Sequence, residues 1–240
     1  MTIRARYKRI ADILVSAFGL IITLPFVCLS LLAVFLQDFH SPFYLAERTG
    51  KDGKTFKMVK IRSMRIGADA VNVWATALGD TRITPVGAFI RKCKFDEIPQ
   101  LWNVLIGEMS LVGPRPLAPA ETAVYTEVER HILDVTPGVT DIASLVLFNE
   151  EELLAGSEDP SAKYDQLIRP WKSRFALIYM KKHSLQLDCK LVMLTALAML
   201  NRPVAIRFLE RLLTTLKVEP MLIAVAAGKQ PLTVVPPPGS

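Results

Sequence analysis

The chain has 240 residues, of which 51% are hydrophobic, and a formal net charge of +6 at pH 7. This length allows one sizeable domain and an anchoring segment. The basic balance suits nucleic acid, an anionic membrane surface or phosphate-rich substrates. No segment resembles a nucleic-acid-binding module, so we expect no nucleic-acid partner. The few cysteines and histidines show no metal-ligand spacing, which argues against a zinc site and indicates a reducing compartment.

The N-terminal segment is basic and then strongly apolar. Four cations lie within residues 4–9, and residues 13–36 contain no charge. As a straight helix the apolar segment would extend about 36 Å, which is enough to cross a bilayer core. It is long for a secretory signal, and no cleavage site of the usual type follows it. An ordinary spanning helix would place residues 40–240 outside the cell, because the basic flank favours the cytoplasm.

A proline at the middle of this segment opens a third possibility. Pro25 removes one helix hydrogen bond and favours a kink, although membrane-spanning helices also tolerate proline. Thr23, two residues earlier, can donate its hydroxyl to a helix carbonyl. From the residues alone, a kinked helix and a straight one remain open.

The middle of the chain has signals for a hairpin and several helices. KDGK at residues 51–54 is typical of a hairpin, with Lys60 and Arg62 on one side of its second strand. A solvated basic strand face is the simpler interpretation of these two cations. Helical patterns cover residues 65–78, 86–105 and 119–134, and Pro99 predicts a boundary within the second. We expect Leu101, Trp102, Leu105 and Ile106 to be packing residues, and residues 136–141 to form a turn.

The C-terminal part is predicted to be helical and then extended. Residues 187–200 are too short and too closely flanked by charge for a clear membrane span, and they suit the bilayer interface. Residues 205–217 have the pattern of a further amphipathic helix. The proline-rich tail is expected to be extended and mobile.

Residues 91–116 contain an adjacent acidic pair, Asp96 and Glu97, between cationic residues. Adjacent carboxylates repel, so cations or a metal ion must stabilise them if both remain ionised. On a helix one carboxylate could attack while the other holds a metal. Arg115 stands in a Pro-Arg-Pro turn, and a rigid guanidinium fork suits phosphate oxygens. Taken by itself, the pair is more often a solvated helix surface.

An ordered set of motifs makes a more specific case. They are KRIAD (8–12), the apolar segment with Pro25, KDGKTFKMVKIRSM (51–64), GDTRITPVGAFIR (79–91), FDEIPQLWNVLIGEMSLVGPRP (95–116), TPGVTD (136–141) and a tyrosine followed by Pro-x-Lys in YDQLIRPWK (164–172). In this order they resemble the bacterial sugar transferase family, the monotopic polyprenyl-phosphate phosphoglycosyl transferases, and the small single-core type among them. The resemblance covers roughly residues 4–200.

The resemblance implies a reaction and roles for the site residues. Asp96 would be the nucleophile that attacks the β-phosphate of a UDP-sugar, releases UMP and passes the phosphosugar to polyprenyl phosphate. Glu97, with Asp96 beside it, would bind Mg²⁺. The phosphate contacts would come from the cations Lys60, Arg62, Arg91 and Arg115.

The resemblance also implies an architecture. The fold would be α+β and mainly helical, with a re-entrant membrane helix kinked at Pro25, a small β-hairpin and interfacial amphipathic helices around the catalytic core. The expected divisions are residues 1–40 for the anchor, 41–202 for the core and 203–240 for the C-terminal helix and tail. The enzyme would lie in the lipid bilayer of the bacterial inner membrane, at its cytoplasmic face, and a homo-oligomer remains open.

Two positions depart from the family pattern. Many relatives have Ser-Pro at the kink, whereas this chain has Leu24-Pro25. The common form continues with Gly after the Thr of the TPGVT segment, whereas this chain has Asp141, so the sugar contacts of this loop are open. The small architecture favours an N-acetylated hexosamine over glucose or galactose. The alternatives are a non-catalytic basic membrane protein and a polyprenyl-diphosphate phosphatase.

Overall fold

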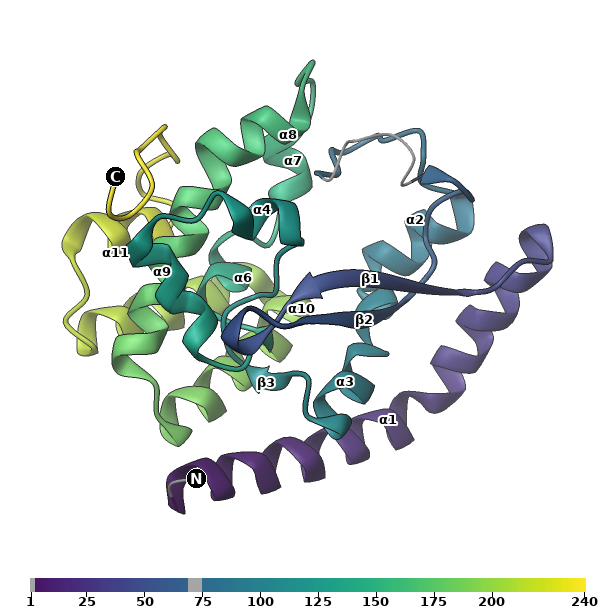
Figure 1. The fold of residues 1–240 in the computed structure, drawn as a ribbon, viewed down its shortest axis with the longest axis horizontal. Helices are drawn as coiled ribbons and strands as arrows, with labels where there is room; N and C mark the ends of the chain where they lie inside the picture. The colour runs from purple at the N-terminus through teal and green to yellow at the C-terminus, as the bar shows by residue number, and fades with distance from the viewer. Residues whose placement is uncertain (1–2, 69–74) are drawn as a thin grey trace.

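The computed structural model describes residues 3–68 and 75–240, and its elements are mainly helical (Figure 1). The hairpin extends from a helical body towards the first two helices (Figure 1). Of the predicted helix over residues 65–78, residues 69–74 lie outside the described residues, and the flanking residues 65–68 and 75–78 are not α-helical. The mainly helical class, the apolar N-terminal helix and the small antiparallel sheet are confirmed.

Helix α1 (Ile3–Asp38) runs along the outside of the fold and changes direction part-way (Figure 1). Pro25 lies inside it, and the hydroxyl of Thr23 donates to the carbonyl of Gly19 at 2.6 Å, as predicted. Val27 and Val34 pack on Ile61 and Ile90, while most other large apolar side chains of α1 are exposed. Among the described residues, α1 and the later helix α10 are long and apolar enough to cross a membrane.

The predicted hairpin is confirmed. Strand β1 (Phe43–Thr49) pairs antiparallel with β2 (Thr55–Ile61), and the 3₁₀ turn η1 (Lys51–Gly53) joins them. The turn places Asp52 and Gly53 at φ of 57° and 74°, a region that Asp and Gly tolerate better than other residues. Met58 and Ile61 are buried on opposite faces of β2: Met58 packs with Ala46 and Val104, and Ile61 packs in the cluster beside α1.

The boundary predicted at Pro99 is also confirmed. Helix α2 (Pro85–Lys92) begins at Thr84, whose hydroxyl accepts from the amide of Gly87 at 2.9 Å. The one-turn 3₁₀ helix η3 (Phe95–Glu97) follows, and α3 (Gln100–Ile106) begins after Pro99 and packs on α1. The prediction that Trp102 and Ile106 are packing residues is wrong. Both are exposed on the outer face of α3, by 53% and 51%.

The TPGVTD segment is a strand rather than a turn. Strand β3 (Ser110–Val112) pairs parallel with β4 (Gly138–Thr140). The two segments approach so closely that a Cβ on Gly138 would lie 2.0 Å from the amide nitrogen of Gly113. Glycine is therefore required at this crossing, which fixes the loop that leads to Arg115.

The single helix predicted over residues 119–134 is wrong. The structure has α4 (Pro119–Ala123), α5 (Glu127–Arg130) and the 3₁₀ turn η4 (His131–Asp134). Thr126 accepts from the amide of Glu129, and the carboxylate of Glu129 accepts from the amide of Thr126. This capping box starts a new helix at a place where the apolar periodicity continues unbroken.

The remaining helices enclose the main core. They are α6 (Ile142–Val146), α7 (Glu150–Leu154), α8 (Pro160–Lys163), the π-helical turn η5 (Tyr164–Ile168), α9 (Arg169–Lys182), α10 (Leu185–Thr215) and α11 (Pro220–Ala226). Helix α10 breaks at Asn201, between the two helical segments that the sequence predicts. Buried side chains from α6, α9, α10 and α11 share one cluster that includes Trp171 and Phe175.

The C-terminal tail is extended, as predicted, and it is docked rather than free. The carbonyl of Thr233 accepts from the Trp171 indole at 2.9 Å, and the carbonyl of Pro236 accepts from Arg174 at 2.7 Å. The carbonyl of Pro238 accepts from Thr126 at 2.5 Å. The tail therefore crosses the helical body from α9 to α5.

Candidate active site

The acidic pair lies on one 3₁₀ turn between α2 and α3. Lys94 precedes it at φ of 57°, a left-handed conformation that is uncommon for a residue with a side chain. This residue ends α2 and redirects the chain, so that Asp96 and Glu97 follow on a separate short turn. Positive φ at a non-glycine residue beside a functional group is typical of sites where geometry is held by the surroundings.

Two cations bind one oxygen of Glu97. Its Oε1 accepts from the Lys60 ammonium at 3.0 Å and from the Arg115 guanidinium. Burial would raise the pKa of Glu97, but Arg115 and then Lys60 outweigh it and hold the pKa well below its usual range. Burial lowers the pKa of Lys60 although Glu97 opposes this, and Glu97 raises the pKa of Arg115. Glu97 is thus an ionised carboxylate, and its Oε2 remains free of hydrogen bonds from the described residues.

Asp96 is different from its neighbour. It is 7% exposed, and its carboxylate has no hydrogen-bond or ion-pair partner within residues 3–68 and 75–240. Burial and the charge of Glu97 raise the pKa of Asp96, while Lys60, Arg91 and Lys94 oppose the rise. The pair thus consists of one engaged carboxylate and one unengaged carboxylate of increased basicity, which is the arrangement that a nucleophile beside a fixed anion requires.

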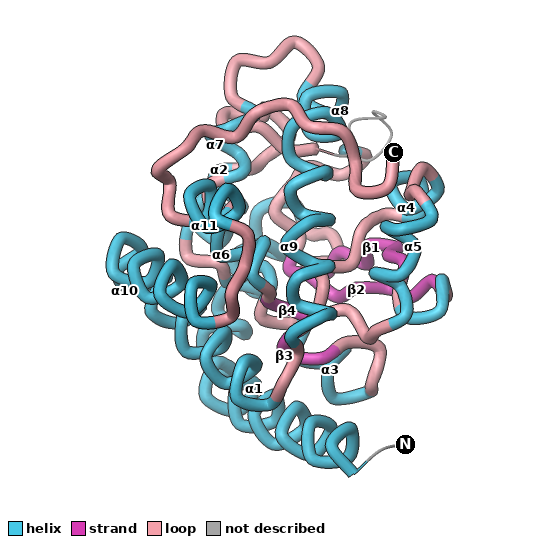
Figure 2. Tube along the Cα trace, turned by 90° about the vertical axis from the view of Figure 1, so that its left-hand side faces the viewer, coloured by secondary structure: helices cyan, strands magenta, loops and turns pink. Residues whose placement is uncertain are grey.

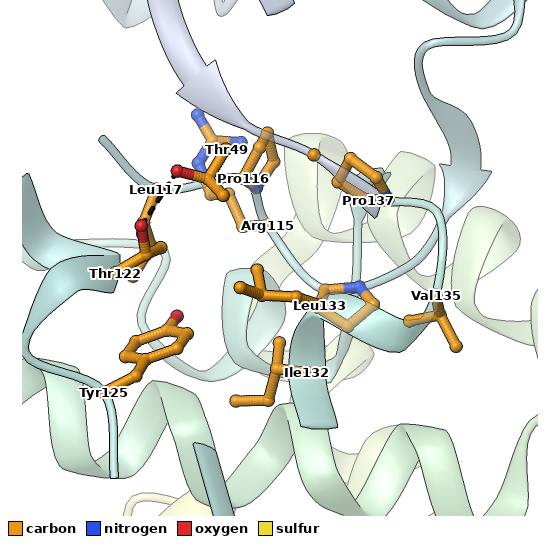
Figure 3. Close-up of a pocket in the computed structure, with 12 residues that line it drawn as sticks. Thr49, Arg115, Pro116, Leu117, Thr122, Tyr125, Ile132, Leu133, Val135 and Pro137 are labelled. Atoms are coloured by element: carbon orange, nitrogen blue, oxygen red, sulfur yellow. Dashed lines mark hydrogen bonds between the residues drawn. The ribbon is translucent and has the colours of Figure 1, made fainter. Parts of the chain in front are cut away.

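The end of the hairpin holds the turn that carries Arg115. The amide of Thr49 donates to the carbonyl of Leu117 at 2.8 Å, and the hydroxyls of Thr49 and Thr122 are 2.8 Å apart (Figure 3). Figure 3 shows Arg115 and Pro116 beside Thr49 at the edge of a small pocket. The guanidinium is therefore presented from a turn that two other elements fix.

A large groove contains all six of the site residues predicted from the sequence. Its volume is about 1920 Å³, and its lining includes Lys60, Arg62, Arg91, Asp96, Glu97 and Arg115. The groove also contains Asp141, which caps α6 by accepting from the amide and the hydroxyl of Ser144, both at 2.7 Å. Burial raises the pKa of Asp141. This space is large enough for a nucleotide sugar.

Two of the predicted phosphate ligands are already paired with acids. The guanidinium of Arg62 binds both carboxylate oxygens of Asp38 at 2.7 Å, at the end of α1. Arg91 binds Glu151 and lies 3.5 Å from the hydroxyl of Ser63. The structure thus brings Lys60 and Arg115 to the acidic pair, places Arg91 within electrostatic reach of Asp96, and holds Arg62 against the end of α1.

The acidic pair is the place where a magnesium ion would fit. The described part of the chain has no cluster of three or more His, Cys, Asp or Glu side chains that could hold a metal. The free carboxylate of Asp96 and the Oε2 atom of Glu97 remain as donors. Mg²⁺ is commonly bound by one or two carboxylates together with substrate phosphates and water. The residues present fit an ion of that kind.

The family model described as bacterial sugar transferase matches residues 3–202. The chain belongs to the bacterial sugar transferase family. Its acidic pair, groove and KRIAD segment all lie within the matched part.

Curated relatives with several names match the chain. It is 46% identical over 127 residues (51% of this chain and 68% of the relative) to a candidate undecaprenyl-phosphate N-acetylgalactosaminyl 1-phosphate transferase of Bacillus subtilis (strain 168). It is 35% identical over 191 residues to the UDP-glucose:undecaprenyl-phosphate glucose-1-phosphate transferase of Escherichia coli (strain K12), covering 78% of this chain and 39% of the relative. It is 36% identical over 150 residues to the exopolysaccharide production protein ExoY of Rhizobium meliloti (strain 1021), covering 56% and 66%. The match to the E. coli relative thus spans about two fifths of that protein's length.

A polar network that sequence reasoning missed anchors the first helix of this family member. Lys8 binds Asp188 at 2.5 Å and donates to the carbonyl of Val112 at 3.0 Å, and Tyr179 donates to Asp188 at 2.7 Å. Figure 2 shows α1 and α10 at the same end of the molecule. KRIAD was part of the motif set, but no local pattern pairs Lys8 with a residue 180 positions away.

Asp12 makes a second anchor. Its carboxylate accepts from the hydroxyl of Ser110 at 2.8 Å and from the amide of Leu111 at 3.2 Å. Both anchors end on β3, directly before the loop of residues 113–115. They therefore fix the apolar helix relative to the turn that carries Arg115.

Proposed function

We propose that this chain transfers a phosphosugar from a UDP-sugar to polyprenyl phosphate. The observation that carries the proposal is the carboxylate of Asp96, which has no partner among the described residues, beside a Glu97 that is held by Lys60 and Arg115, inside a groove large enough for a nucleotide sugar. The relatives named as sugar-1-phosphate transferases support this reaction class.

Asp96 is the nucleophile in this proposal. One oxygen of its carboxylate attacks the β-phosphorus, the bond from this phosphorus to the bridging oxygen breaks, and UMP leaves with that oxygen and the electron pair. An oxygen of polyprenyl phosphate then attacks the same phosphorus, and the Asp96 carboxylate leaves. The products are polyprenyl-diphosphate-sugar and the free enzyme, and ping-pong kinetics follow from the covalent step.

The cations around the pair bind and orient the phosphates. Arg115 offers its N–H donors from a fixed turn. Lys60, on strand β2, binds the same Glu97 oxygen as Arg115. Charge that develops on the phosphoryl oxygens is stabilised most by donors that are already in place. Arg91, near the end of α2, also lines the groove and adds positive charge near Asp96. Arg62 would contribute only after release from Asp38.

Mg²⁺ would be held by Glu97 and Asp96, and when bound it supplies positive charge to the diphosphate. We expect excess chelator to reduce UMP release to background and added Mg²⁺ to restore it. The measurement is UMP release with and without EDTA, followed by titration with MgCl₂. A chelator-treated enzyme with unchanged turnover would remove the ion from the account.

The sugar is best found by a direct screen. The relatives' names include N-acetylgalactosamine and glucose, and we propose an N-acetylated hexosamine for this chain. UDP-sugars are incubated with the protein and undecaprenyl phosphate, and UMP is quantified. Continued, multiple-turnover UMP release that needs polyprenyl phosphate and is fastest with an N-acetylhexosamine supports the proposal. Absence of UMP with every UDP-sugar favours a non-catalytic protein, and release of inorganic phosphate from a polyprenyl diphosphate favours a phosphatase.

The membrane arrangement is a further part of the proposal. The exposed apolar side chains of α1 form a surface that water solvates poorly and that a bilayer would cover. UDP-sugars are cytoplasmic, so the groove must face the cytoplasm, and the basic residues in the first turns of α1 favour the same side. We propose that α1 enters and leaves the inner membrane at its cytoplasmic face, with the bend near Pro25.

Cysteine labelling tests this arrangement. In a variant that lacks Cys28, Cys93 and Cys189, single cysteines are placed at the exposed positions Arg6 and Lys51. Both should react with an impermeant maleimide only after the membrane is permeabilised. Labelling of position 51 alone in intact cells would indicate a spanning helix and an external groove.

A further inference from the structure

Two adjacent acids of the short helix α7 bind cations from different walls of the groove. Glu151 pairs with Arg91 at the end of α2, and Glu150 pairs with Lys172 of α9 at 2.6 Å. Lys172 also lies 3.1 Å from the hydroxyl of Tyr164 and 4.7 Å from the centre of its ring. Neighbouring helical side chains point about 100° apart, so one turn of helix can reach both walls.

The backbone of α7 is itself fixed. The carbonyl of Glu151 accepts from the amide of Leu78 at 2.9 Å, and Leu154 is fully buried in a cluster with Tyr164 and Ile168. The ammonium of Lys94 lies 4.8 Å from the ring centre of Phe148, just before α7. Glu151 thus projects from a backbone segment that is held on several sides and pairs with Arg91 from there.

The Arg91 guanidinium has few other contacts among the described residues that would hold it in one position. Within that part of the chain its Nε is buried without a hydrogen-bond partner, and besides Glu151 its guanidinium contacts the hydroxyl of Ser63 at 3.5 Å. Arginine has a long side chain with many rotamers, so a guanidinium without an ion-pair partner would be spread over several positions. Arg91 is close enough to Asp96 to oppose the rise of its pKa. The position of this guanidinium therefore bears on the groove beside the acidic pair.

We propose that Glu151 is a positioning residue for the transfer: it holds the Arg91 guanidinium in the groove wall, where it faces the diphosphate beside Asp96. This inference rests on the proposed function. A contribution to folding stability does not account for this ion pair. The side chains of Arg91 and Glu151 are 22% and 37% exposed, and ion pairs with that exposure add little to stability.

The test follows the first turnover of UMP release without polyprenyl phosphate, at UDP-sugar concentrations below saturation. The amplitude reports the fraction of active enzyme, and the rate reports attack by Asp96. We expect Glu151→Gln to lower the rate about tenfold, because a misplaced catalytic group costs rate, with the amplitude unchanged. Glu151→Asp should recover part of the rate. Glu152→Gln removes the same charge from an exposed residue whose carboxylate, within the described part of the chain, bonds to Asn149, and it should match the wild type.

A double-mutant cycle decides whether Glu151 acts through Arg91. In an Arg91→Ala background, Glu151→Gln should have no further effect on the rate. Equal losses in both backgrounds, or a fall in amplitude without a fall in rate, would overturn the inference. A wild-type protein that releases no UMP, or releases it without a stoichiometric first turnover, would instead contradict the proposed function.

Discussion

Replacement of Asp96 by Asn is expected to lower kcat by on the order of 10⁴-fold or more, because the amide cannot form the covalent intermediate. The folded state should be at least as stable as the wild type. The Asp96 carboxylate is buried, has no partner among the described residues and is repelled by Glu97, so its ionised form costs free energy that Asn removes. The measurements are UMP release and thermal unfolding of the two proteins in the same detergent.

A control separates loss of the nucleophile from general loss of charge. Asp52→Asn changes an exposed aspartate in the hairpin turn, at a φ that asparagine tolerates, and should leave kcat unchanged. Wild-type-like turnover by Asp96→Asn would remove Asp96 from the role of nucleophile. If Asp96→Asn is inactive because it is unfolded, its thermal unfolding curve will lack the folded transition. The same two measurements are then made on Asp96→Ala.

The second large effect is expected at Gly138. An added Cβ would lie 2.0 Å from the amide nitrogen and 2.5 Å from the carbonyl oxygen of Gly113, so β4 would have to move away from β3. We expect Gly138→Ala to destabilise the protein by about 3 kcal/mol or more, as overpacking against backbone does. For a chain of this size, that corresponds to a fall in Tm of about 10 °C. Activity should fall as well, because residue 113 lies two positions before Arg115.

Gly228→Ala is the matched control for this substitution. Gly228 has a φ of 68° and open space around it, so an added methyl strains the local backbone without a clash. Its cost should be about 1 kcal/mol. If the two variants lose the same stability, the close approach of β3 and β4 is not what requires glycine at position 138.

Local signals in the sequence predicted the elements that local chemistry determines. KDGK predicted the hairpin because Asp52 and Gly53 accept left-handed backbone. Pro99 predicted a boundary, and α3 begins directly after it: Ile98 before it is still helical, so the proline acts through its missing backbone N–H. The prediction for residues 119–134 failed for a local reason of another kind, since the capping box of Thr126 and Glu129 overrides the apolar periodicity.

The residues that assemble the groove are far apart in sequence, and no periodicity connects them. β3 and β4 have three residues each, too few to predict a parallel pairing, and the tail is docked by carbonyls that any sequence would supply. Arg91 meets Glu151 across 60 positions. The family motifs predicted that Lys60, Asp96, Glu97 and Arg115 belong to one site, but they did not predict how these residues are arranged. The contact of Glu151 with Arg91 could be found only in the structure, because a run of acidic residues such as 150–152 is usually solvated surface.

The central claim is that the phosphosugar is carried on Asp96. It is tested most directly by the intact mass of the protein after incubation with the accepted UDP-sugar and Mg²⁺, without polyprenyl phosphate. The account predicts a mass increase of one phosphosugar on the peptide that contains Asp96, absent from Asp96→Asn and lost when polyprenyl phosphate is added. A wild-type protein that releases UMP only when both substrates are present, and never gains this mass, would contradict it.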